Sequence, residues 1–418
     1  MYIKRYLFKT LLNHLDSPEI TIIVGPRQVG KTTLLLKLKE YLEKKGEKTL
    51  FLNYDLDKDR PFFSSQIALV NKIKLFFGNQ KGFVFLDEIQ RKENASLFLK
   101  GLYDMNLPYK FIVTGSGSLE LKEKIHESLP GRKRLFYLRS VSFWEFLNFK
   151  TNYQFEQKKR EFLKIEKILA KEILNEYLMF GGYPKVILAE TLKEKQIIIN
   201  DIFQSFLEKD ISLLLQVEKT ESLSKLTRLI AHQQGQLINY SELAGNVGIS
   251  QPTVKKFLWY LEKTFILARV YPFSKKRKEI VKAPVVYFQD LGMANFLRGQ
   301  FGLSINQINN AGLLFQNFIY QLLEEKIENT IWSLNYWRSK DGAEVDFVID
   351  KGSTSLPVEV KYSESSDSKI PRGLSSFIKK YQQERAFVVN LNIENQLFKN
   401  STEINFLPYY QIDKIFEN

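Results

Sequence analysis

Short apolar runs alternate with longer amphipathic stretches in residues 1–150, and this alternation predicts strands that alternate with helices. The runs at 20–24, 48–55, 82–88 and 110–118 have the length of strands, and the run at 82–88 is typical of a buried parallel strand. A helix-like run begins at Thr33, between the first two of them. We therefore expect an α/β domain with a parallel sheet over residues 1–150.

Helical patterning dominates the middle of the chain. Residues 151–178 lack Pro and Gly and mix Lys and Glu with Phe, Ile and Leu, which predicts one amphipathic helix. The sequence Gly-Gly-Tyr-Pro at 181–184 interrupts this pattern, and a second long helix is predicted over 191–215. These stretches predict a helical segment over residues 151–220.

The rest of the chain divides into two parts. Residues 222–270 have a helix-turn-helix pattern with Gly248 at the turn, and two apolar runs follow on either side of a basic stretch. This pattern resembles a winged helix-turn-helix, which we place at 221–290. Strands within 331–361, a helix near 373–381 and two later strands predict a further α/β domain over residues 291–418.

Composition supports several folded domains and narrows the chemistry. The chain has 418 residues, of which 44% are hydrophobic and 14% aromatic, so a disordered protein is excluded. The absence of cysteine excludes disulfides and thiolate metal sites, and the three histidines are too far apart in sequence to favour a zinc site. No stretch approaches the roughly 20 apolar residues of a membrane span, and the first residues lack a signal-peptide core. We therefore expect a cytoplasmic protein with no membrane partner.

The charge of the chain is strongly positive. A net charge of +14 and a pI near 9.4 would attract polyphosphates and nucleic acid. A lysine-rich solvated surface without a specific partner explains the same balance equally well. Charge alone therefore leaves both interpretations open.

A specific motif lies between the first predicted strand and its helix. Residues 25–32 match G-x-x-x-x-G-K-[ST], in the strand–loop–helix context in which this P-loop motif is informative. Glycines allow the backbone N–H groups to wrap a phosphate, the lysine reaches the β- and γ-phosphates, and the following threonine ligates Mg²⁺. The segment predicted to bind ATP comprises Gly25, Pro26, Arg27, Gln28, Val29, Gly30, Lys31, Thr32 and Thr33.

An acidic pair at a later strand end complements the P-loop. Asp87 and Glu88 follow four apolar residues in a Walker B pattern. Asp87, together with Thr32, would bind Mg²⁺. Glu88 would polarise the attacking water as general base. The two motifs together predict ATP hydrolysis that depends on Mg²⁺.

Polar and basic residues further along the chain are candidates for reading the γ-phosphate. Thr114 or Ser116 lies on a strand expected between the two motifs, where a polar sensor would sit. Arg132 is the candidate arginine, with Arg134 as the alternative. Such an arginine acts in cis or from a neighbouring subunit, and the second arrangement requires a homo-oligomer.

Outward residues of the predicted helix-turn-helix are candidates for DNA contacts. Gln251, Thr253, Lys255 and Lys256 would lie on the part of a recognition helix that meets a major groove. The wing would add phosphate contacts from four consecutive cations, namely Lys275, Lys276, Arg277 and Lys278. The alternative is that the winged helix packs between domains or binds protein.

Charged residues alternate along two strands near the carboxyl end. Strand geometry puts Glu344 and Asp346 on one face, and Glu359 and Lys361 share a face of the next strand. A hairpin would gather these groups in the Asp…Glu-x-Lys arrangement of restriction-endonuclease-like folds. Asp346 and Glu359 would then bind Mg²⁺, and Lys361 would orient water. The alternative is an amphipathic hairpin with solvated charges.

Taken together, the motifs resemble the AAA-type ATPases of bacteria and archaea that carry a C-terminal domain of unknown function. The likeness covers nearly the whole chain and includes residues 25–32, 85–90, 113–116, 131–132, 141–146 and 181–184. The resemblance implies that the helical segment after the ATPase core is a lid. It also implies a glutamate before the nuclease-like strands, where this chain has Gln316, and a neutral amide binds Mg²⁺ more weakly.

These patterns lead to three hypotheses of function. In the first, ATP and Mg²⁺ bind at the amino end, and ATP hydrolysis repositions a DNA-binding, nuclease-like C-terminal half. In the second, the protein is a nucleotide-switched regulatory or signalling protein whose C-terminal domain is a catalytically inert binding platform. In the third, the C-terminal half recognises protein and not DNA.

Overall fold

The chain forms two compact units, each built from separate stretches of sequence. Our computed structural model describes residues 1–116, 129–212, 220–274, 283–308, 310–363 and 368–417. Unit 1 comprises Met1–Phe149, Tyr183–Glu221 and Phe257–Ile266, and unit 2 comprises Lys150–Gly182, Ser222–Lys256 and Leu267–Asn418. The structure therefore divides both the predicted helical segment of 151–220 and the predicted helix-turn-helix of 221–290 between the two units.

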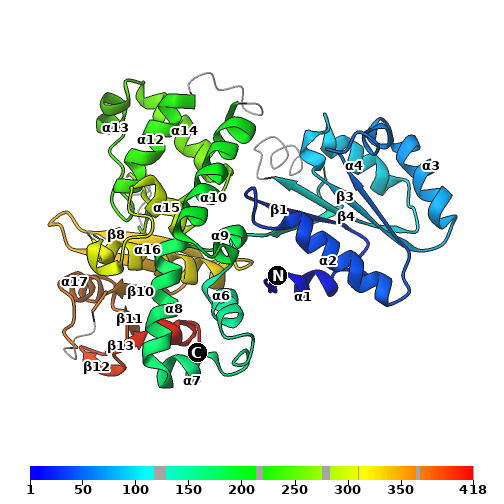
Figure 1. Ribbon diagram of the computed structural model, residues 1–418. Helices are drawn as coiled ribbons and strands as arrows, with labels where there is room; N and C mark the ends of the chain where they lie inside the picture. Colours follow the sequence, from blue (N-terminus) through cyan, green and yellow to red (C-terminus); the bar gives the residue numbers. More distant parts are fainter. Residues whose placement is uncertain (117–128, 213–219, 275–282, 309, 364–367, 418) are drawn as a thin grey trace. The chain divides into compact units, whose positions relative to one another are not determined.

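Unit 1 is built on a parallel sheet of five strands in the order β2-β3-β4-β1-β5 (Figure 1). The strands are β1 (Ile20–Gly25), β2 (Thr49–Asn53), β3 (Gly82–Asp87), β4 (Tyr109–Ser116) and β5 (Lys133–Tyr137). All residues of β1, β3 and β4 are buried, as expected for parallel strands covered on both faces. Strand β4 lies between β1 and β3, which confirms the predicted position of a strand between the P-loop and Walker B strands.

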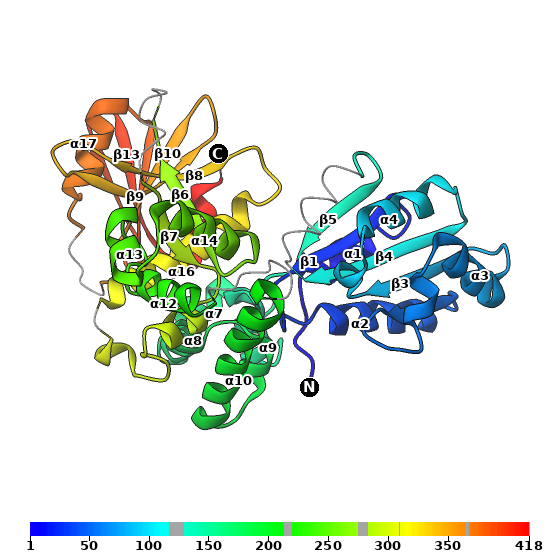
Figure 2. The same cartoon turned by 90° about the horizontal axis from the view of Figure 1, so that it is seen from above.

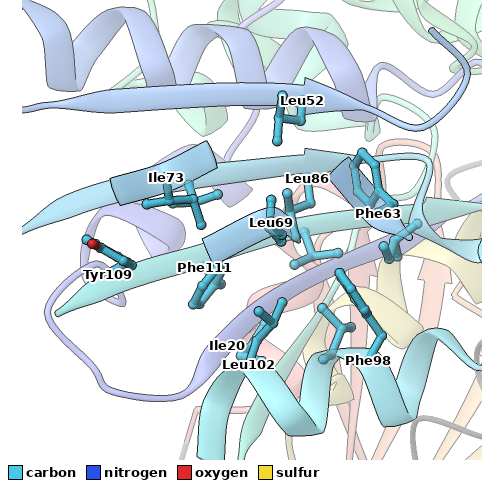
Figure 3. Packing of buried hydrophobic residues seen from close by; sticks show 14 of the residues in the cluster. Ile20, Leu52, Phe63, Leu69, Ile73, Leu86, Phe98, Leu102, Tyr109 and Phe111 are labelled. Carbon is cyan, nitrogen blue, oxygen red and sulfur yellow. The ribbon is translucent and has the colours of Figure 1, made fainter. Parts of the chain in front are cut away.

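Helices cover both faces of this sheet. Figures 1 and 2 show α2 (Lys31–Lys44) on one face and α3 (Gln66–Phe77) with α4 (Ala95–Asp104) on the other. Figure 3 shows how the second face is packed, with Leu69 and Ile73 of α3 and Phe98 of α4 against Leu86 and other strand residues. Because the strands are parallel, their carboxyl ends meet at one edge of the sheet.

A helical segment from the middle of the chain also belongs to unit 1. It comprises α9 (Pro184–Leu188), α10 (Leu192–Ser205) and a π-helical turn, η3 (Phe206–Ser212). A capping box starts α10, because Thr191 Oγ1 accepts a hydrogen bond from the Glu194 backbone and the Glu194 side chain accepts one from the Thr191 backbone. A π-helix of this kind is rare and is found mostly at functional sites.

The single helix predicted over 151–178 is wrong. Residues 151–157 form turns, and the helical part is divided into α7 (Lys159–Ile165) and α8 (Lys167–Phe180) by the non-helical conformation of Glu166. Phe155 stacks on Phe162 with their rings 4.7 Å apart, so the turn folds back onto α7. The apolar pattern was therefore that of a turn packed on a helix, and not of one continuous helix.

Unit 2 is built on one mixed sheet of eight strands in the order β12-β13-β11-β10-β9-β8-β6-β7. The strands are β6 (Leu267–Pro272), β7 (Val285–Phe288), β8 (Ser333–Arg338), β9 (Glu344–Asp350), β10 (Ser355–Val360), β11 (Arg385–Asn390), β12 (Asn395–Lys399) and β13 (Thr402–Pro408). Tyr271 and Pro272 of β6 pair with Asn335 and Tyr336 of β8. The predicted boundary at 290 therefore does not separate two sheets.

The helices of the later part of the chain are α12 (Thr220–His232), α13 (Tyr240–Val247), α14 (Gln251–Lys263), α15 (Leu291–Leu297), α16 (Ala311–Ile327) and α17 (Arg372–Tyr381). Gly248 ends α13 with a φ of 77°, which agrees with the predicted turn. Among the described helices, none combines the length and the apolar sequence needed to cross a lipid bilayer.

The Gly181-Gly182 pair has a packing role within unit 2. It follows α8, which lies so close to the start of α15 that a Cβ on Gly292 would be 2.1 Å from the Phe180 carbonyl oxygen. Asp290 caps α15 by accepting a hydrogen bond from Met293 N at 2.9 Å, and it also accepts one from Gly182 N at 2.8 Å. The glycines therefore permit a close approach of two helices that larger residues would prevent.

Candidate active site

The carboxyl ends of β1, β3 and β4 meet beside the start of α2 in unit 1. The segment predicted to bind phosphate runs from Gly25 at the end of β1, through Gly30 with a φ of 96°, to Thr33 in the first turn of α2. The adjoining cavity measures about 590 Å³ and is lined by this loop, by Glu88 and by residues of the amino terminus and of α9. A helix amino terminus and inward-facing amides suit the binding of an anion such as phosphate.

Lys31 is buried within this loop. Its Nζ donates hydrogen bonds to Gly25 O at 3.0 Å and to Pro26 O at 2.8 Å. Burial lowers the pKa of Lys31 to about 8, although the charges of Glu88 and Asp210 oppose this shift. A cation that is held by carbonyl groups alone is well suited to exchange them for phosphate oxygens.

Asp87 receives hydrogen bonds from three neighbouring elements. Thr32 Oγ1 donates to Asp87 Oδ2 at 2.8 Å, Asn53 Nδ2 donates to the same oxygen at 3.0 Å, and Thr114 Oγ1 donates to Oδ1. Burial raises the pKa of Asp87, and the hydrogen bonds from Thr114 and Thr32 act in the opposite direction. The residues fit a Mg²⁺ ion, because a hydroxyl and a carboxylate oxygen meet where the ion would bind.

Glu88 lies next to Asp87 in a strained backbone conformation. Its φ is 58°, which is uncommon for a residue other than glycine and is found preferentially at functional sites. Its backbone N–H donates to Thr114 Oγ1 at 3.4 Å, and its Oε2 accepts a hydrogen bond from Gln90 Nε2 at 2.5 Å. Thr114, predicted as a sensor, therefore contacts both members of the acidic pair.

Three further residues near the loop, Asn53, Asp210 and Arg5, were not assigned to the site by the sequence interpretation. Asn53 ends β2 at the same edge of the sheet, and this polar strand end was a signal that could have been used. Arg27 Nε donates to Asp210 Oδ2 at 2.9 Å, although the two residues are far apart in sequence and only the fold brings them together. Burial raises the pKa of Asp210, while Arg27 acts against this shift. Arg5, the third, contacts the loop backbone at Val29 O.

The structure does not bring Arg132 to the phosphate loop. The Arg132 carbonyl accepts a hydrogen bond from Ile20 N, at the opposite end of β1, and its Nε donates to Asp104 Oδ1 at 2.7 Å. Because β1 has six residues, the phosphate loop at its carboxyl end lies about 17 Å from its amino end, where Arg132 is bonded. Arg134, the alternative, pairs with Thr21 at the same end of the sheet. These positions disagree with the expectation that Arg132 or Arg134 contacts the γ-phosphate bound to its own chain. A contact with the nucleotide of a neighbouring subunit stays a prediction.

The predicted carboxylate cluster assembles only in part in unit 2. Asp346 of β9 and Glu359 of β10 each lie one residue beyond the last antiparallel pair, Phe347 with Val358, and Lys361 Nζ donates to Glu359 Oε1 at 2.7 Å. Gln316 of α16 donates from Nε2 to Asp346 Oδ1 at 2.7 Å, and Val360 N donates to Oδ2 at 2.7 Å. The Glu344 side chain is 64% exposed and lies near Arg338. Both oxygens of Asp346 therefore already have protein partners.

Burial governs the charges of this cluster. It raises the pKa of Asp346 well above its usual range, and the neighbouring Glu359 raises it further. Burial also raises the pKa of Glu359, against the effect of Lys361. For Lys361, burial alone would lower the pKa, but Glu359 and Asp346 outweigh it and raise the pKa. Within the described part of the chain, no three acidic or histidine side chains are arranged to bind a metal ion.

The predicted DNA-contacting residues are only partly described. Gln251, Lys255 and Lys256 are exposed on α14, whereas Thr253 is half-buried. The Lys255 ammonium lies 5.3 Å from the centre of the Tyr240 ring. The basic stretch Lys275, Lys276, Arg277 and Lys278 lies outside the described residues. DNA binding by these residues stays a prediction.

Three family models match successive stretches of the chain. Residues 17–147 match the family described as AAA domain. Residues 171–304 and 311–412 match families described as domains of unknown function, DUF8612 and DUF4143. Among solved structures, the replication initiator DnaA bound to AMPPCP and single-stranded DNA is similar over 63% of this chain and 90% of that chain, with 15% identity and a TM-score of 0.28. At so low a TM-score, this likeness supports neither a fold nor a function.

Uncharacterized proteins resemble the chain over most of its length. One from Haemophilus influenzae is 27% identical over 367 residues, which are 84% of this chain and 84% of that protein. One from Methanocaldococcus jannaschii is 27% identical over 382 residues, which are 90% of this chain and 81% of that protein. Residues 17–147 are therefore similar to an AAA domain and carry a phosphate-loop motif and an acidic strand end, and the regions that follow are similar to two families of unknown function.

Proposed function

We propose that unit 1 binds ATP with Mg²⁺ and hydrolyses it. The observation that carries this proposal is the hydrogen bond from Thr32 Oγ1 to Asp87 Oδ2 at 2.8 Å. It joins the start of α2 to the end of β3, so the two groups that a P-loop site uses for Mg²⁺ lie at one point. When bound, Mg²⁺ would supply positive charge to the phosphate oxygens.

The remaining roles fall to residues around this point. Lys31 would exchange its two carbonyl partners for the β- and γ-phosphate oxygens, and the loop amides would cradle the phosphates. Glu88 would accept a proton from the attacking water. Thr114 would keep Glu88 in place through the Glu88 backbone N–H.

The Glu88→Gln variant tests the hydrolytic step. We expect it to bind ATP with Mg²⁺ about as tightly as the wild type but to lower kcat about 1000-fold, because a neutral amide cannot accept the proton. Calorimetric titration would give the affinity, and phosphate release would give the rate. Glu93→Gln, an exposed carboxylate nearby in sequence, is the matched control and should keep the wild-type rate. A Glu88→Gln variant that hydrolyses ATP at the wild-type rate would contradict the assignment.

For unit 2, a second candidate function is a binding platform that does not cleave DNA. The contact that favours it is the Gln316 amide on Asp346, because it occupies one carboxylate oxygen and supplies no charge for a metal ion. The exposed Lys255 and Lys256 and the net charge of +14 favour DNA as the bound molecule. ATP hydrolysis in unit 1 would then change how unit 2 binds DNA and would not drive DNA cleavage.

A plasmid assay separates the platform from a nuclease. We expect the protein to retard duplex DNA, with an affinity that falls steeply as salt rises, and to leave supercoiled plasmid intact with Mg²⁺ or Mn²⁺. Nicking that disappears in Asp346→Ala would contradict the platform and support the nuclease. If the retardation of duplex DNA did not change with the salt concentration, this would count against DNA as the bound molecule and favour recognition of protein.

A further inference from the structure

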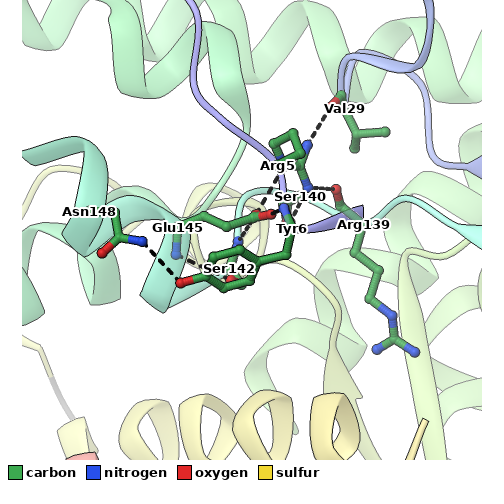
Figure 4. Close-up of polar contacts among 8 residues, drawn as sticks. All are labelled: Arg5, Tyr6, Val29, Arg139, Ser140, Ser142, Glu145 and Asn148. Atoms are coloured by element: carbon green, nitrogen blue, oxygen red, sulfur yellow. Dashed lines mark hydrogen bonds and ion pairs between the residues drawn. The ribbon is translucent and has the colours of Figure 1, made fainter. Parts of the chain in front are cut away.

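Arg5 is a buried cation from the amino-terminal segment that reaches the backbone of the phosphate loop. Figure 4 shows its guanidinium among three carbonyl groups and a carboxylate. Nη1 donates to Val29 O at 2.9 Å, and Nη2 donates to Arg139 O at 2.7 Å and to Ser140 O at 3.1 Å. Arg5 also lines the cavity beside the loop. The side chain thus connects the segment before α1 (Leu7–Leu12), the loop and the segment after β5.

Glu145 holds Arg5 in this position. Arg5 Nε donates to Glu145 Oε2 at 2.9 Å, with both side chains less than one-tenth exposed. The same carboxylate accepts hydrogen bonds from Tyr6 N at 2.6 Å and from Ser142 N at 3.0 Å, at the start of α6 (Phe143–Lys150). Because the carboxylate is itself fixed by backbone groups, the guanidinium has one preferred orientation.

The contact with Val29 has a consequence for the next residue. The peptide group between Val29 and Gly30 is planar and trans, so its carbonyl and its N–H point in opposite directions. Holding Val29 O therefore also fixes the direction of the Gly30 N–H, which is one of the loop amides that would cradle phosphate. Gly30 has a φ of 96°, a region in which glycine has many alternatives, so an outside contact is needed to select one.

We propose that Arg5 is a positioning residue for the phosphate loop, with Glu145 as its anchor. By fixing the peptide group between Val29 and Gly30, the pair presents a preorganised set of amides to the phosphates of the nucleotide. An arginine is suited to this task because its planar fork donates in several fixed directions and stays charged when buried. This inference rests on the proposed binding of ATP at the loop.

The Arg5→Lys variant tests the proposal. Lysine keeps the charge but cannot reproduce the fork, so the KM for ATP and the Kd for ADP should both rise about tenfold, which corresponds to one lost charge-assisted hydrogen bond. The value of kcat should change less than about twofold, because binding in the ground state and in the transition state is weakened equally. All measurements are made at a temperature at which circular dichroism shows the variant to be folded. Arg5→Ala should likewise raise KM and leave kcat nearly unchanged, with a larger rise in KM than Arg5→Lys.

Lys110→Met provides the matched control. Lys110 is likewise a buried cation that donates to backbone carbonyls, to Ser17 O at 2.7 Å and Glu19 O at 2.6 Å, but it lies at the opposite edge of the sheet. We expect this control to lower the melting temperature and to leave KM unchanged. A folded Arg5→Lys variant with the wild-type KM, or a Lys110→Met variant with an equal rise in KM, would overturn the proposal. If the wild type binds neither nucleotide, the proposed function fails instead.

Discussion

Replacing Lys31 by alanine should weaken ATP binding at least about 100-fold and bring hydrolysis below detection. The side chain is buried and donates to Gly25 O and Pro26 O, and in the proposed nucleotide complex its ammonium group would exchange these two partners for phosphate oxygens. Hydrogen bonds to a charged partner contribute about 1.5 to 3 kcal/mol each, and a buried ammonium that reaches two phosphates would make more than one. Calorimetric titration of ATP and ADP, with and without Mg²⁺, measures the loss.

Lys37→Ala is the control on the same helix. Lys37 is partly exposed on α2 and forms a surface ion pair with Glu40, so its removal changes the charge of the protein by the same amount without reaching the loop. We expect it to leave the Kd for ATP within about twofold of the wild type, since surface pairs contribute little. A Lys31→Ala variant that still binds and hydrolyses ATP normally would remove the basis for the proposed function.

The Gly292→Ala variant should destabilise unit 2 by about 3 kcal/mol, because one added methyl group would overlap the end of α8. Its Cβ would lie 2.1 Å from Phe180 O and 2.5 Å from Phe180 C, which are backbone atoms that cannot rotate away. Separating the two helices would also stretch the bonds from Asn295 Nδ2 to Leu178 O and Met179 O. In differential scanning calorimetry, the transition of unit 2 should fall by about 10 °C.

Gly312→Ala is the matched substitution in the same unit. Gly312 lies in the first turn of α16, and an added Cβ meets nothing within 4 Å. Alanine is the better helix former, so this variant should gain about 0.5 to 1 kcal/mol. Equal effects of the two substitutions would show that the close contact of α8 with α15 does not limit stability.

Local patterns were sufficient to predict the sheet of unit 1 and the position of its phosphate loop. Continuous apolar runs mark β1, β3 and β4, because parallel strands are buried on both faces and need no alternation. The spacing of residues 25–32 places Lys31 at the start of α2, since the motif itself dictates the turn. Asp87 follows from the same reasoning, because a polar residue that ends a buried strand lies at the edge where the loop is.

The features that were not predicted depend on contacts between residues that are far apart in the sequence. Asp210 reaches Arg27 only through the path of α9 and α10, and the amino-terminal Arg5 reaches Val29 only because α6 supplies Glu145. Arg132 was assigned from its place in a basic loop, but the direction of β5 puts it at the far end of the sheet. The break at Glu166 was hidden because the sequences of α7 and α8 join into one continuous amphipathic pattern without Pro or Gly.

The hydrogen bonds between β6 and β8 determine where the carboxyl-terminal half can be dissected. Phe273 N donates to Tyr336 O at 2.6 Å, and Tyr271 and Pro272 pair beside it. A fragment limited to residues 311–412, as the last matched family suggests, would lose this neighbour and expose the unpaired N–H and C=O groups of β8 to intermolecular pairing. The sheet of unit 2 is thus wider than the stretch matched by the last family, and an expression fragment that keeps the pairing of β6 with β8 needs to begin ahead of β6.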